Sequence, residues 1–93
     1  MDKKVLLVVC ENEELLDNLK QELEIEYYVL DTDNYQEIDN YCRAIIIDYL
    51  LIEQAIFLQC DKTINELENI YHKPIIIIDN NNEAIKEKLN NIN

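Results

Sequence analysis

The sequence predicts one α/β domain over residues 1–93, a doubly wound, three-layer fold whose four-stranded parallel sheet has the order 2-1-3-4 and carries helices on both faces. Apolar runs of strand length alternate along the chain with amphipathic segments of helical period. Three of the four runs are apolar without alternation, which is typical of strands buried on both faces of a sheet. A chain of 93 residues has room for a single modest core.

The first half of the chain supplies two strands and a helix. Residues 5–9 form a continuous β-branched and leucine run that predicts the first strand. Asn12 can cap a helix in which leucines recur at helical spacing opposite acidic residues. A second strand is predicted from Tyr27 to Leu30, where polar residues end it. Residues 35–41 are ambiguous and predict no more than a short helix.

The middle of the chain is the hardest part to interpret. Residues 44–47 are β-branched and apolar, and we predict them as the third strand, ending at Asp48. Residues 49–59 hold six large apolar residues around a single charge, Glu53. This stretch fits a helix, an extension of the third strand or an apolar loop, and the sequence leaves the three open.

The last third of the sequence predicts a helix, a strand and a final helix. Thr63 and Glu66 have the spacing of a capping box, which begins a helix that continues to about His72. Pro74 opens a fourth strand of four consecutive isoleucines, Ile75, Ile76, Ile77 and Ile78. Asn82 can cap the last helix.

Composition excludes several classes of function. The sequence contains no glycine, so it has neither the dinucleotide-binding fingerprint nor the phosphate loop that depend on this residue. A formal net charge of −12 disfavours nucleic acid and anionic membranes as partners. No apolar run approaches the length of a membrane span. Three widely spaced cysteines fit a reducing cytoplasm, and no cysteine–histidine cluster suggests zinc.

Each predicted strand delivers a carboxylate to one edge of the sheet. In doubly wound sheets, ligands bind beyond the carboxyl ends of the strands, near the point where the strand order reverses. Glu11 and Asp48 flank that point in the predicted order, and a pair of carboxylates there could hold Mg²⁺. Acids that follow strands are also ordinary loop starters and helix caps, and that alternative stays open.

The same segments resemble the receiver domains of two-component signalling systems, which have a flavodoxin-like fold. Residues 4–8, followed by Glu11 and an amphipathic helix, look like the opening of a receiver. Residues 43–50 look like the strand that carries its phosphoacceptor aspartate, which matches Asp48, and residues 74–78 look like its fourth strand. The resemblance covers the first four of the family's five strand–helix units. It implies a signalling role, with phosphorylation of Asp48 assisted by Mg²⁺ as one possible activity.

The chain departs from the receiver pattern at most of the site. The acidic pair that holds Mg²⁺ in the family falls on Val9 and Cys10, and an acid is retained only at Glu11. The hydroxyl position after the fourth strand falls on Asp79, and the fifth strand with its lysine is missing. A phosphoryl group on Asp48 would then lie among acids without a lysine to offset its charge. We therefore predict a degenerate, non-catalytic receiver-like module, a pseudo-receiver.

A second family resembles the chain through its cysteine. The cysteine-phosphorylated subunits of sugar phosphotransferase systems also have four parallel strands and a nucleophilic cysteine after the first, which matches Cys10. In that family the loop after the cysteine is rich in small and hydroxyl residues, whereas here residues 11–14 contain three acids that would make the thiolate scarce. Cys10 remains the alternative nucleophile, and a small buried apolar residue is the other interpretation.

The fourth predicted strand indicates which surface binds another protein. Without a fifth strand, residues 75–78 form an edge of four isoleucines with no charge, and unprotected edges of this kind pair with another chain. We therefore expect a cytoplasmic protein-interaction module that forms a homodimer or docks a partner protein through Ile75, Ile76, Ile77 and Ile78.

Overall fold

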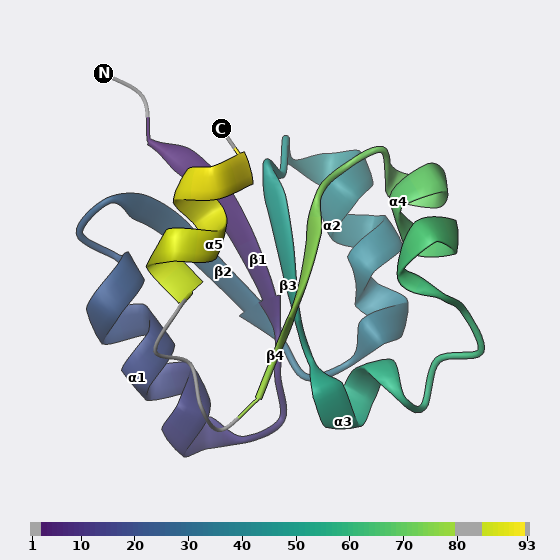
Figure 1. Ribbon diagram of the computed structural model, residues 1–93, viewed down its shortest axis with the longest axis horizontal. Helices are drawn as coiled ribbons and strands as arrows, with labels where there is room; N and C mark the ends of the chain where they lie inside the picture. Colours follow the sequence, from purple (N-terminus) through teal and green to yellow (C-terminus); the bar gives the residue numbers. More distant parts are fainter. Residues whose placement is uncertain (1–2, 80–84, 93) are drawn as a thin grey trace.

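The computed structural model describes residues 3–79 and 85–92, and its strands and helices alternate along the chain (Figure 1). The first half comprises β1 (Lys4–Val9), α1 (Glu13–Leu23), β2 (Tyr27–Thr32), the 3-10 helix η1 (Tyr35–Glu37) and α2 (Ile38–Ala44). The second half comprises β3 (Tyr49–Glu53), α3 (Gln54–Phe57), α4 (Ile64–Tyr71), β4 (Ile75–Ile78) and α5 (Ile85–Ile92).

The sheet has four parallel strands in the order β2-β1-β3-β4, which confirms the predicted α/β topology. Leu6 pairs with Val29 on one side and with Tyr49 on the other, and β4 pairs with β3 from Ile75 onward. β1 and β3 are therefore central, and β2 and β4 are the two edges. Among the described residues no helix is both long enough and apolar enough to cross a membrane.

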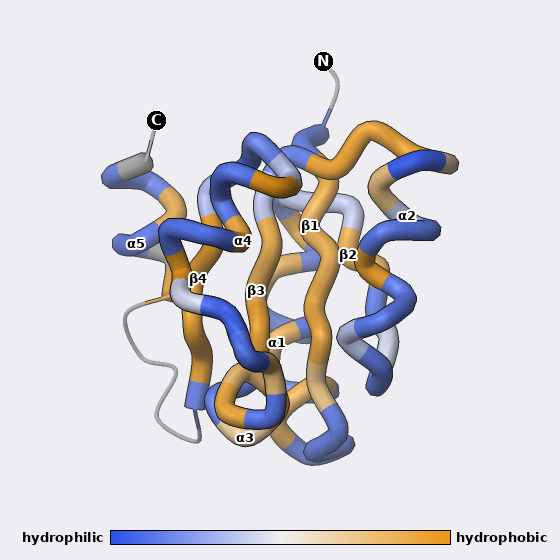
Figure 2. Tube along the Cα trace, turned by 90° about the vertical axis from the view of Figure 1, so that its right-hand side faces the viewer, coloured by the Kyte–Doolittle hydropathy of each residue, from blue (hydrophilic) through white to orange (hydrophobic). Residues whose placement is uncertain are grey.

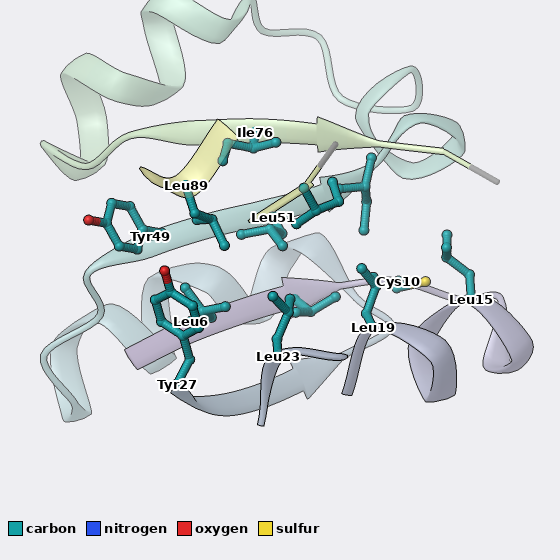
Figure 3. Packing of buried hydrophobic residues seen from close by; sticks show 13 residues of the cluster. Leu6, Cys10, Leu15, Leu19, Leu23, Tyr27, Tyr49, Leu51, Ile76 and Leu89 are labelled. Atoms are coloured by element: carbon teal, nitrogen blue, oxygen red, sulfur yellow. The ribbon is translucent and has the colours of Figure 1, made fainter. Parts of the chain in front are cut away.

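Two apolar clusters lie on opposite faces of the sheet, because successive side chains of a strand point to opposite sides. On one face, α1 and α5 cover alternate residues of β1 and β3, and Leu19, Leu51 and Leu89 are fully buried there (Figure 3). On the other face, α2, α3 and α4 cover the intervening residues, such as Leu7 and Leu50. Helices on both faces explain why the strands are apolar without alternation.

Polar side chains begin the helices where the sequence predicts them. The Asn12 side chain accepts a hydrogen bond from the backbone N–H of Leu15, which caps α1. Thr63 and Glu66 form the predicted capping box at the start of α4. α4 ends at Tyr71 and is followed by the C-cap residue His72, whose backbone is left-handed with φ 57°. The predicted cap of the last helix, Asn82, lies outside the described residues.

The predicted third strand is wrong. α2 continues through Ala44, and β3 begins only at Tyr49, so the strand is the later of the two apolar runs. The residues of β3 from Tyr49 to Ile52 are at most 3 % exposed, whereas Ile46 is 81 % exposed in the connection from α2. This connection appears as a hydrophobic stretch along the top of the molecule (Figure 2). The run that can be buried on both faces forms the strand.

Candidate functional site at the carboxyl edge of the sheet

The carboxyl ends of the strands form an acidic edge, as the sequence predicts, but one of its acids is not the predicted one. Glu11 follows β1 and Asp33 follows β2, while Asp79 follows β4. The fourth acid is Glu53, the last residue of β3, which pairs with Ile78. Every strand therefore places a carboxylate within two residues of its end.

Glu53 is the residue of this edge that sequence reasoning missed. One of its carboxylate oxygens (Oε1) accepts a hydrogen bond from the backbone N–H of Glu11 at 2.9 Å, which ties the end of β3 to the loop after β1. The available signal was that Glu53 is the single charge after a run of apolar residues at 50–52. An acid in that position marks the carboxyl end of a buried strand once the strand itself is placed correctly.

Asp48 lies at the opposite edge of the sheet, which corrects the predicted Glu11–Asp48 pair. Its backbone N–H donates to the carbonyl of Val5 at 2.9 Å, and its carboxylate accepts from the N–H of Val5 at 2.7 Å. Val5 is at the start of β1, whereas Glu11 follows its end. Residues 5 and 11 are about 20 Å apart at the rise of extended chain, so Glu11 and Asp48 cannot share one cation. In this structure Asp48 links the start of β3 to the start of β1 by hydrogen bonds.

The acids at the carboxyl edge lie near one another, and four of them line one hollow, but their arrangement is not that of a metal site. Within residues 3–79 and 85–92, no group of three or more histidine, cysteine or acidic residues has the arrangement to hold a metal ion. Asp31, near the end of β2, is paired with the Lys20 ammonium of α1 at 2.6 Å. The geometry of the described residues therefore offers Mg²⁺ no ready set of ligands.

Cys10 is buried beneath the acidic edge, beside Leu15 and Leu19 of α1 (Figure 3). Its thiol donates to the backbone carbonyl of Asn12 at 3.3 Å. Burial, and secondarily the negative charge of Glu53, raise the pKa of Cys10 to about 11. At neutral pH the thiol is protonated, and a protonated thiol is neither a good nucleophile nor a good metal ligand. This environment favours the interpretation of Cys10 as a small core residue.

Hollows in the described surface coincide with the predicted site only in part, because one is lined by Cys10 and Glu11 but not by Asp48. One, of about 320 Å³, lies beyond the ends of β1 and β2 rather than at the reversal between β1 and β3. Its lining includes four acids, so it would repel phosphate. A second, of about 60 Å³, lies among β3, η1 and helices α2, α3 and α4 and is largely apolar. It is smaller than the roughly 150 Å³ of a cavity that admits benzene.

The β4 edge presents backbone groups to the outside of the sheet. The N–H of Leu50 donates to the carbonyl of Pro74 at 3.1 Å, and Leu50 pairs with Ile75. Because hydrogen-bonding direction alternates along a strand, the N–H and C=O groups of Ile75 and Ile77 point away from β3. No further strand pairs with β4 in the part of the chain that the structure describes.

The side chains of β4 are used within its own domain. Ile75, Ile76 and Ile78 are buried, at 8 %, 7 % and 1 % exposure, and only Ile77 is partly exposed. The predicted surface of four isoleucines is therefore available to a partner mainly through its backbone. Lys73 precedes the strand and Asp79 follows it, so the edge has opposite charges at its two ends.

Comparisons with known proteins identify no relative. No family model matches the chain, and no curated protein and no solved structure matches it significantly.

Proposed function

We propose that this chain is a non-catalytic, receiver-like signalling or protein-interaction module that self-associates through β4. The observation that carries the proposal is the β4 edge, which no further strand covers within residues 3–79 and 85–92 and where Ile75 and Ile77 direct their backbone donors and acceptors outward. An edge strand that is neither charged along its length nor covered by another strand is a template for strand addition. Strand addition through the main chain is also a common mode of protein–protein recognition.

The non-catalytic part of the proposal is supported by the positions of the two candidate nucleophiles. Asp48 lies at the amino edge with its carboxylate bound to the N–H of Val5. The Cys10 thiol is held protonated. The phosphoacceptor alternatives, on Asp48 with Mg²⁺ or on Cys10, have no observation of this structure in their favour.

Self-association can be measured by light scattering coupled to size-exclusion chromatography, and by sedimentation equilibrium, from about 10 μM to about 1 mM, the range of weak interfaces. We expect a monomer–dimer equilibrium for the natural sequence. The substitution Ile77→Pro removes one outward N–H without removing a bond to β3, and it should shift the equilibrium to monomer. A second substitution, Ile77→Lys, keeps the N–H but charges the edge, and it should act in the same direction.

Ile77→Val is the matched control, because it keeps the backbone donor and the β-branched side chain. Circular dichroism and thermal melting of each variant establish that it is folded. A natural sequence that remains monomeric at 1 mM, or variants at Ile77 that dimerise as the natural sequence does, would refute self-association through β4.

A further inference from the structure

We draw no further inference here: the strongest candidate, the exposed apolar surface that Ile45 and Ile46 form in the connection between α2 and β3, carries none, because nothing in the structure shows what covers it.

Discussion

Replacing Asp48 by alanine should destabilise the fold, because this carboxylate acts as a structural clamp between two strands. It accepts the N–H of Val5 at 2.7 Å, while the backbone N–H of Asp48 donates to the carbonyl of Val5 at 2.9 Å. Both residues are partly buried. A hydrogen bond to a charged group contributes about 1.5–3 kcal/mol, and partial exposure places this one near the lower end, at about 1.5–2 kcal/mol.

Thermal and urea unfolding measure this loss. For a domain of this size, about 1 kcal/mol corresponds to roughly 4–8 °C in melting temperature, so Asp48→Ala should melt about 6–16 °C below the natural sequence. Asp48→Asn keeps an oxygen acceptor and loses only the charge. Its melting temperature should therefore lie between those of Asp48→Ala and the natural sequence. Asp33→Ala is the matched control at an exposed acid and should change the unfolding free energy by less than about 0.5 kcal/mol. Equal melting temperatures for Asp48→Ala and Asp33→Ala would refute the clamp.

Four further outcomes follow from the environments of single residues. Incubation with a small phosphodonor and Mg²⁺ should leave the intact mass unchanged; a phosphoryl gain that Asp48→Asn abolishes would reinstate the phosphoacceptor. Cys10 should resist iodoacetamide at pH 8, because its pKa is raised from its usual 9.0 to about 11; rapid labelling of Cys10, mapped by peptide mass, would contradict its burial. The same shift makes the Cys10 contribution to stability complete below about pH 9 and lost as pH rises toward about 11, so the loss across this interval should be smaller in Cys10→Ala. Thr63→Ala should cost about 1 kcal/mol in urea unfolding through loss of the capping box, whereas Thr63→Ser should cost little.

Local signals in the sequence predicted most of the fold. Asn12 and the Thr63–Glu66 pair begin their helices as expected, because a capping side chain bonds to a backbone N–H only two or three residues away. The strand order also follows from local reasoning, because short apolar runs joined by helices permit few topologies. The burial of Cys10 was one of two interpretations that the sequence left open, and its pKa is raised by that burial first and by Glu53, which is distant in the sequence, second.

The third strand failed because two apolar runs compete for one place in the sheet, and local composition does not choose between them. The length of the preceding connection chooses between them only once the end of β2 is known. β2 ends at Thr32, and its parallel connection must pass β1 to reach β3. Counted from this observed end, a strand starting at residue 44 would leave residues 33–43, fewer than the dozen or more that a parallel connection needs, whereas the predicted end at Leu30 would leave residues 31–43, which suffice. A start at Tyr49 leaves residues 33–48, which accommodate η1 and α2.

The choice between these two runs also determines the interpretation of function. Asp48 lies between them, so it ends the strand if the first run is chosen and precedes the strand if the second is. In a parallel sheet these are opposite edges, and only the carboxyl edge is where such folds bind ligands. Because the second run forms the strand, Asp48 lies at the amino edge, where it bonds to Val5. Glu53 then lies at the carboxyl edge. The placement of this one strand therefore separates a candidate phosphoacceptor from a structural carboxylate.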